Sequence, residues 1–552
     1  MFEDSFFRSH VCRVEVQHES LGSIGFGELS FGNGGWPTLH LEQSMTPPKL
    51  TDGEAYPKLT ATTATGEVLS LIACAYHGRS VLAEAMIEGD PGEAFRGICI
   101  RLVDVSEWFL SGRNLVSRDA STTSAQSGPI DVAIRAGENS FSLRSTVVSA
   151  SETQGNQAGE DYVRFTFEPH KNPFGMEDVR LKCRELSGLI SLLLAQVIDV
   201  QTVWVIGESA QLHATYFPHF NRKQDQGKGW FIPRCLIQRN RLDGQWQQVI
   251  ENYYRSPFRE VAWARMAGML RYDSFWEYRV IGYFSMLDGV MEERLRGQSI
   301  PRVPPARRKI DEFIRRAGHL AEPLSSGQLS RLVGIVKEMF SKSDSVGARY
   351  RLATSASDRR VMSVINISDD DLETITEIRN QIAHGGALKL PEGGPETLML
   401  LVDKVVVLLT YWAYVDLGFS DDVFLKCLHA SHNPLLRDDR IDRFLLDREL
   451  GEADFYAVSA ERFESLAAIK TIRSGACFTR DGTGEIEYSE RHTSMLKGWQ
   501  QSGVSGRITP ESIFGLPSRD VTFSPKAYVH SGERRLDLHW IYVIEREDPV
   551  VQ

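Results

Sequence analysis

Cysteine is scarce in this sequence, and no two cysteines form a recognisable pair. The 552 residues include seven cysteines, and none has the CxxC spacing of zinc sites and redox motifs. An odd, scattered set does not indicate a disulfide framework. We therefore expect reduced thiols in a cytoplasmic protein, with neither a metal ion nor another cofactor.

Long apolar runs are also absent. The longest apolar run covers residues 186–198, and it falls short of the ~20 residues that a membrane-spanning helix needs. The first residues include two acidic side chains and no apolar core of signal-peptide length. We expect residues 186–198 to form a buried helix and the protein to have no membrane partner.

Positive charge is not in excess. Lysine and arginine number 62 against 73 aspartate and glutamate, a formal net charge of −11. Such a chain does not coat nucleic acid by bulk electrostatics, so any RNA contact requires a local basic patch. We take Arg307, Arg308 and Lys309 as candidate RNA-binding residues, with a solvated helix face as the alternative. They belong to a longer basic run that comprises Arg302, Arg307, Arg308, Lys309, Arg315 and Arg316.

The order of sequence patterns predicts an α+β protein with several domains. Residues 1–240 contain short alternating runs typical of strands, separated by turn residues. Residues 245–445 have the apolar spacing of amphipathic helices, and residues 446–552 mix both patterns. We expect a β-rich sensing or regulatory domain, an all-helical bundle and a small α+β extension over these three ranges.

A glycine-dense segment near the N-terminus, GSIGFGELSFGNGGW, has near matches to phosphate-binding loops. A phosphate-binding loop must lead into a helix, whereas this segment leads into the predicted strand TLHLE. We interpret its glycines as turn residues.

The segment SDDDLETITEIRNQIAHGG has clear signals for the start and the end of a helix. Ser368 is the expected N-cap, with Asp371 as its capping-box partner. Gly385 and Gly386 are expected to end the helix in the left-handed conformation. The predicted helix covers about 369 to 384, so His384 lies in its last turn.

Arg379, Asn380 and His384 form the candidate catalytic group on this helix. RNA cleavage without a metal needs a histidine that moves a proton while the 2′-hydroxyl attacks its own phosphate. It also needs a cation such as Arg379 to stabilise charge on phosphorus. Asn380 lies one turn before His384, within reach to orient its ring. The spacing alone is a weak signal, because it recurs twice in strand-like stretches; a capped structural helix end is the alternative.

In its setting between long helices, RNQIAH resembles the motif of the HEPN superfamily, an arginine followed by a polar residue and then by a histidine. Residues 10–430 also resemble ApeA-type HEPN proteins, because LGSIGFGELSF, LSLIACAYHG and IRLVDVSEWF occur in the expected order. The resemblance implies an endoribonuclease of bacterial antiphage defence that acts by abortive infection. It implies Arg379 and His384 as the catalytic pair and Asn380 as an orienting residue.

Two further expectations concern assembly and regulation. The chemistry needs an acid and a base, so a homodimer built on the helical domain would supply the second histidine and arginine. The resemblance implies the same dimer, and we expect a phage-derived trigger to act on the N-terminal domain. It also implies a polar residue on the first long helix, for which Asp288 is best placed, with a solvated residue as the alternative. The alternative function is a non-catalytic module that binds RNA or protein and regulates a partner.

Overall fold

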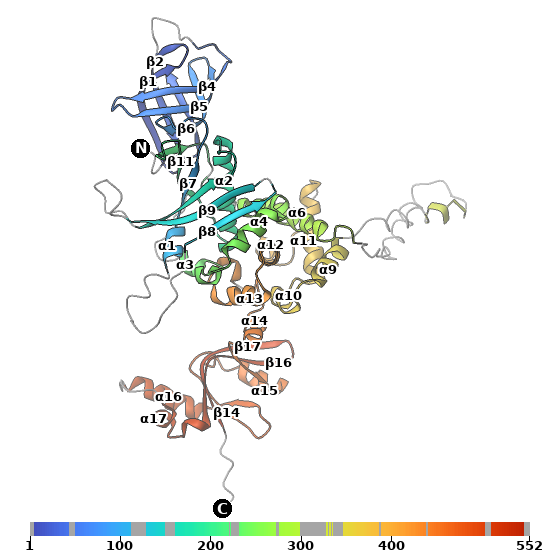
Figure 1. Cartoon of the computed structure of the whole chain (residues 1–552). Helices are drawn as coiled ribbons and strands as arrows, with labels where there is room; N and C mark the ends of the chain where they lie inside the picture. Colours follow the sequence, from blue (N-terminus) through green and yellow to red (C-terminus); the bar gives the residue numbers. More distant parts are fainter. Residues whose placement is uncertain are drawn as a thin grey trace, which may run out of the picture. The chain divides into compact units, whose positions relative to one another are not determined.

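The computed structural model of the chain divides into two compact units (Figure 1). The first comprises residues 1–358 and 365–441, and the second comprises residues 359–364 and 442–552. The structure describes residues 5–42, 50–111, 129–137, 139–149, 161–219, 221, 231–271, 275–298, 327–328, 330–332, 334, 346–385, 388–437, 440–502 and 509–545.

The N-terminal half of the first unit is built on one long antiparallel sheet. Within the described residues its strand order is β3-β2-β1-β4-β5-β6-β12-β11-β7-β10-β9-β8, and β3 also pairs with β6. This extra pairing closes the first six strands into a barrel, whose interior positions such as Val14, Leu29 and Leu59 are buried. The barrel strands are β1 Ser9–His18, β2 Gly22–Gly32, β3 Gly35–Leu41, β4 Ala55–Thr63, β5 Val68–His77 and β6 Ser80–Glu88.

The turn interpretation of the glycine-dense segment is wrong for most of its length. Residues 22–32 form strand β2 of the barrel wall rather than a turn. A Cβ atom on Gly27 would lie 2.7 Å from the backbone oxygen of His40 on the adjacent strand, so close strand packing explains this glycine. The sequence also predicted that a strand, TLHLE, follows this segment. Strand β3 is found there.

Six further strands extend the sheet beyond the barrel. Their inner face is covered by helices α1, α2 and α4, against which apolar residues such as Ile100, Phe165 and Val203 are buried. The strands are β7 Gly97–Leu102, β8 Asp131–Ala136, β9 Asn139–Val148, β10 Tyr162–Pro169, β11 Val200–Ile206 and β12 Leu212–Tyr216. The covering helices are α1 Val105–Leu110, α2 Met176–Leu194 and α4 Trp246–Arg255.

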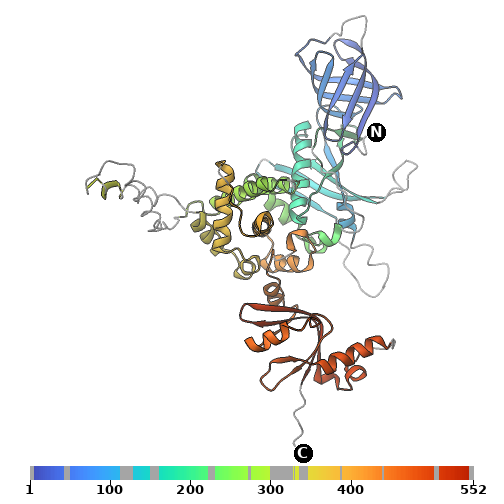
Figure 2. The same ribbon diagram turned by 180° about the vertical axis from the view of Figure 1, so that it is seen from behind.

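The rest of the first unit is helical, and α6, α11 and α12 pack on one another, as both ribbon views show (Figures 1 and 2). The helices are α3 Phe231–Arg234, the 3-10 turn η2 Arg239–Leu242, the π-helix η3 Arg259–Trp263, α5 Ala264–Met269, α6 Trp276–Arg294, α9 Val346–Ser355, α11 Asp369–Ala383, α12 Gly394–Leu417, α13 Asp421–Ala430 and the 3-10 turn η4 Pro434–Leu436. The run at 186–198, expected to be a buried helix, lies mostly in α2 and is buried.

Helix α12 is the central helix of this region. Its length and composition would let it cross a membrane, and it is the one such helix among the residues that the structure describes. Of its most apolar stretch, 78% is buried inside the protein. Asp403 in this helix is 5% exposed and accepts hydrogen bonds from Arg279 and Arg440 at 2.7 and 2.6 Å. A carboxylate held in this way by two arginines is compensated within the protein interior.

The second unit is a mixed sheet with helices on both faces. Its strand order is β13-β16-β17-β14-β15, in which β13 and β14 run parallel to their partners β16 and β17. One face packs on α15 and the other on α16 and α17. The elements are α10 Arg359–Ile365, α14 Arg443–Leu450, β13 Asp454–Ala457, α15 Ala460–Ala467, β14 Cys477–Arg480, β15 Ile486–Tyr488, α16 Glu490–Gln501, α17 Pro510–Phe514, the 3-10 turn η5 Ser518–Asp520, β16 Val521–Ser531 and β17 Arg534–Glu545.

The fold is therefore mixed α and β, with a β-rich N-terminal half followed by helices, as the sequence predicts. Closure of the first six strands into a barrel was not part of that prediction. Helix α10 lies before the motif helix in the chain, yet it groups with the second unit. Over the described part of residues 245–441 the elements are helices.

Candidate functional site

The motif helix α11 begins and ends where its sequence predicts. The Ser368 hydroxyl accepts a hydrogen bond from the backbone N–H of Asp371 at 3.0 Å, and the Asp371 carboxylate accepts one from the backbone N–H of Ser368 at 3.0 Å. His384 is the C-cap, and Gly385 has a φ of +66°, the left-handed conformation expected of it. The capping box and the stop at Gly385 are confirmed, and Gly386 lies outside the described residues.

One face of α11 is buried, and this fixes the position of the helix. Leu372, Ile375 and Ile378 recur every three residues and pack toward α6, α9 and α12. Arg379 follows Ile378 directly, so its side chain starts at the boundary between the core and the surface. It is half-buried, whereas Asn380 and His384 are exposed.

The Arg379 guanidinium is held by two contacts. Its Nη1 donates a hydrogen bond to the side-chain oxygen of Asn380 at 2.9 Å. Its central carbon lies 5.9 Å from the ring centre of Phe284, a residue of α6 that is 2% exposed. A guanidinium over an aromatic face is attracted by the ring's negative face. The two contacts restrict the orientation of the cation and leave other N–H groups available to a ligand.

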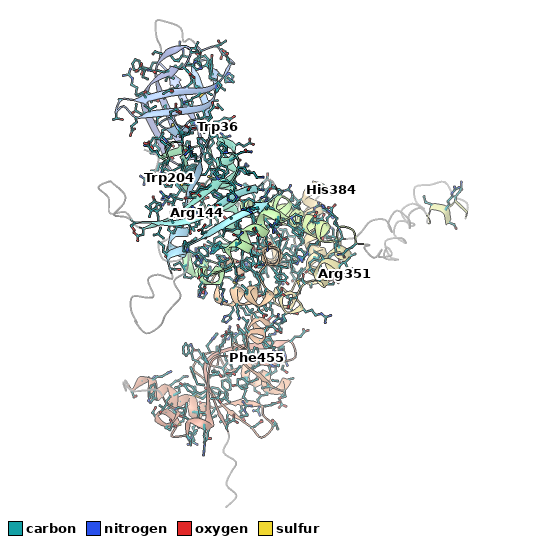
Figure 3. All side chains as sticks on the ribbon, in the orientation of Figure 1. Trp36, Arg144, Trp204, Arg351, His384 and Phe455 are labelled. Carbon is teal, nitrogen blue, oxygen red and sulfur yellow. The ribbon has the colours of Figure 1, made fainter. Side chains whose placement is uncertain are left out.

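The His384 imidazole lies at the surface end of the same helix (Figure 3). Its backbone N–H donates to the carbonyl oxygen of Asn380 at 3.0 Å, which fixes its Cα at the helix terminus. The structure gives no hydrogen bond between the side chains of Arg379 and His384. Asn380 instead connects the two residues, since its side chain contacts Arg379 and its backbone contacts His384. The sequence predicted that the Asn380 side chain orients the His384 imidazole. In this structure it orients the Arg379 guanidinium.

The remaining residues that the sequence singled out have separate surroundings. Asp288 on α6 forms an ion pair with Arg349 of α9, with 2.8 Å between Oδ1 and Nη2. The candidate RNA-binding residues Arg307, Arg308 and Lys309 lie outside the described residues. Over the described part of the chain, no three His, Cys, Asp or Glu side chains group as ligands of a metal ion.

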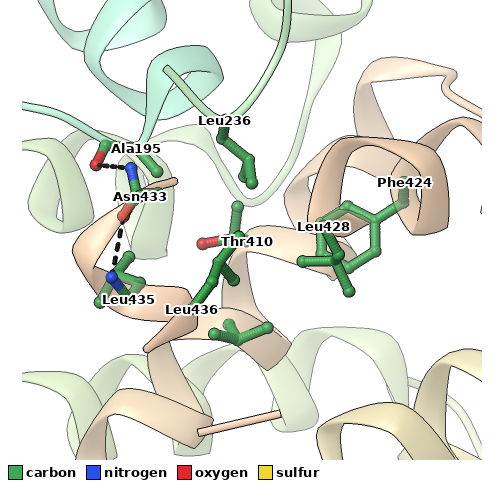
Figure 4. A pocket seen from close by; sticks show the side chains of 9 residues that line it. Ala195, Leu236, Thr410, Phe424, Leu428, Asn433, Leu435 and Leu436 are labelled. Atoms are coloured by element: carbon green, nitrogen blue, oxygen red, sulfur yellow. Dashed lines mark hydrogen bonds between the residues drawn. The ribbon is translucent and has the colours of Figure 1, made fainter. Parts of the chain in front are cut away.

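Two pockets lie among the described residues away from the candidate group, and neither is bordered by Arg379, Asn380 or His384. A small apolar pocket lies between the end of α2 and helices α12 and α13, and Asn433 borders it, donating to the Ala195 carbonyl oxygen at 3.1 Å (Figure 4). Its volume of about 10 Å³ is at the lower limit for one water molecule, so it is a packing void. A wider pocket is bordered by Glu292, Arg296 and Arg349. His384 is exposed at the end of its helix, and such a surface site can accept a polymeric ligand that an enclosed cavity could not hold.

Comparison with known proteins identifies no relative: no protein-family model, no curated protein and no solved structure matches the chain. Any function assigned to Arg379 and His384 therefore rests on their own chemistry and geometry and on the likeness of the motif.

One contributor to the site was missed by the sequence analysis. Phe284 lies in the range predicted only to form amphipathic helices, and its contact with Arg379 depends on how α6 packs against α11. No local pattern carries that information.

Proposed function

We propose that the protein is a metal-independent endoribonuclease. The 2′-hydroxyl of the substrate attacks the adjacent phosphorus, and the bond from phosphorus to the 5′-oxygen breaks. The products carry a 2′,3′-cyclic phosphate and a 5′-hydroxyl. One histidine accepts the proton of the 2′-hydroxyl, and a second donates a proton to the leaving 5′-oxygen.

In this proposal Arg379 binds the phosphate oxygens and stabilises the negative charge of the transition state. His384 provides one of the two proton transfers. A second copy of the chain, joined through the helical region in a homodimer, provides the other histidine. The biological role that the motif suggests is antiphage defence by abortive infection through damage to RNA.

The observation that carries the proposal is the different surroundings of the two groups. The Arg379 guanidinium is held by Phe284 and Asn380, while the exposed His384 ring stands at the end of the same helix. A fixed cation suits charge stabilisation, because it needs no reorganisation as charge develops. An exposed imidazole suits proton exchange with substrate and solvent.

Cleavage of a labelled RNA in EDTA tests the proposal. Wild type is expected to cut, and His384→Ala is expected to lose activity by at least a hundredfold, the usual contribution of a general acid or base. His429→Ala is the matched control, because His429 also lies in the last turn of a helix, α13. Equal activity of wild type and His384→Ala, or activity that disappears with EDTA, would overturn the proposal.

A further inference from the structure

The side of strands β7 to β11 that faces away from helices α1, α2 and α4 carries arginines on neighbouring strands. Residues of a strand alternate between its two faces, and the apolar ones here point to the helices. The alternate positions of β7, β8, β9 and β10 carry four arginines against two carboxylates among the described residues, a local charge of 4 − 2 = +2. The arginines are Arg101, Arg135, Arg144 and Arg164, and the carboxylates are Asp131 and Glu168. The chain as a whole has a net charge of −11, so this face departs from the average.

The strand register joins an arginine and a tryptophan in one row. Arg144 pairs with Thr166, Thr166 with Cys99, and Cys99 with Trp204. With strands about 4.8 Å apart, Arg144 and Trp204 are separated by about 14 Å across the sheet. Arg144 is 51% exposed and Trp204 is half-buried, and Figure 3 labels both residues on this part of the sheet.

A second row brings two arginines together. Phe165 pairs with Ile100, so Arg164, one residue before Phe165, lies beside Arg101, one residue after Ile100. The Arg101 guanidinium lies 4.1 Å from the ring centre of Tyr162, and the Nε of Arg164 is buried with no hydrogen-bond partner among the described residues.

We infer that this face, defined by Arg101, Arg144, Arg164 and Trp204, binds single-stranded RNA. Guanidinium groups match phosphate oxygens with paired N–H donors, and the partly exposed indole of Trp204 offers a surface on which an unpaired base stacks. A base is available for such stacking in a single strand, whereas in a duplex it is stacked inside. The inference rests on the proposed function for the identity of the polymer. It assigns the β-rich half a role in holding the substrate.

Binding is measured with the full chain and a fluorescein-labelled, 12-nucleotide, 2′-O-methyl RNA by fluorescence anisotropy. Without a free 2′-hydroxyl this probe is not cut by the proposed mechanism, so binding is measured apart from cleavage. The double variant Arg144→Gln/Arg164→Gln is expected to raise Kd about tenfold or more. The slope of log Kd against log salt concentration is expected to fall by about two. Trp204→Ala is expected to raise Kd about tenfold.

The control is Arg13→Gln/Arg519→Gln, which removes the same charge from two exposed arginines outside the face, 67% and 85% exposed. It is expected to change Kd less than threefold. Glu168→Gln should change Kd in the opposite direction, because the Glu168 carboxylate lies 3.2 Å from Arg144 and competes for it. Its removal leaves Arg144 paired with Asp131 alone, at 3.3 Å between Nε and Oδ1, and is expected to tighten binding, an effect that damage to the fold does not produce.

The inference is overturned if wild type does not bind the probe, or if the face variants bind it like the control. It is also overturned if a 12-residue polyglutamate peptide binds as tightly and ignores Trp204→Ala, since the face would then accept any polyanion or acidic protein. The inference and the proposed nuclease fail separately. His384→Ala is expected to bind the probe like wild type, and the face variants are expected to raise the KM for cleavage of unmodified RNA without changing kcat.

Discussion

The guanidinium of Arg379 lies 5.9 Å from the ring centre of Phe284, a buried residue of a different helix. This relationship connects the core of the helical region to the candidate site. A change in the core at this point should therefore alter the chemistry more than it alters the stability.

Phe284→Leu removes the ring and retains an apolar side chain of similar position. We expect kcat for RNA cleavage to fall about tenfold, because the guanidinium loses one of its two constraints, while the Tm falls by a few degrees. The control is Leu287→Ala, which opens a cavity one turn away, where Leu287 is fully buried. It should lower the Tm more and kcat less. If Leu287→Ala lowered kcat more than Phe284→Leu does, Phe284 would act through packing alone.

Ser368→Ala tests the N-cap of the motif helix. The lost hydrogen bond to the backbone N–H of Asp371 should destabilise the first turn of α11 by about 1 kcal/mol. Amide hydrogen exchange in that turn should become about fivefold faster. Ser355→Ala, on α9, removes a hydroxyl that donates within its own helix and is the control. Unchanged exchange in the Ser368 variant would contradict the cap.

The cysteines predict one reactive thiol in the folded chain. Cys12 is half-buried and the other six are buried, and burial raises the pKa of Cys74 and of Cys427 to about 12. Since the thiolate is the reactive form, an aromatic disulfide reagent at pH 8 should label Cys12 alone, and slowly, because burial and the Glu67 carboxylate raise its pKa as well. Unfolding in guanidinium chloride should expose all seven, and Cys12→Ser should abolish labelling of the folded chain. Fast labelling of two or more thiols in the folded state would contradict the described burial.

Truncation of the chain after Ile441 should expose apolar surface. Residues 359–364 group with residues 442–552, and the Val364 carbonyl oxygen accepts a hydrogen bond from the Asp442 N–H at 2.7 Å. Val361 and Val364 are fully buried, so removal of the remainder of their unit uncovers them. We expect stronger binding of a hydrophobic dye and a greater tendency to aggregate than in the full chain. If the truncated chain bound no more dye than the full chain does, α10 would be stable without the rest of the second unit.

Local signals in the sequence were sufficient to predict α11, and long-range contacts were not. The capping box at Ser368 and the stop at Gly385 depend on neighbouring residues, so both were confirmed. The contact between Arg379 and Phe284, the pairing of β3 with β6 and the grouping of α10 with the second unit each join distant parts of the chain. Patterns of 2 or 3.6 residues carry no information about such contacts.

The same reason explains why the arginine face of the sheet was not recognised in the sequence. A basic run such as 302–316 stands out because its residues are adjacent. Arg101, Arg144 and Arg164 are far apart in the sequence, and the register of three strands brings them together. The turn interpretation of the glycine segment failed for a related reason, since close packing between two strands explains Gly27.

The chemistry of the product ends tests the central claim most directly. RNA digested by the full chain in EDTA is analysed by mass spectrometry, with His384→Ala alongside. The account predicts new ends that carry a 2′,3′-cyclic phosphate and a 5′-hydroxyl, present with wild type and absent with the variant. Ends with a 3′-hydroxyl and a 5′-phosphate, or the same ends from both proteins, would contradict it.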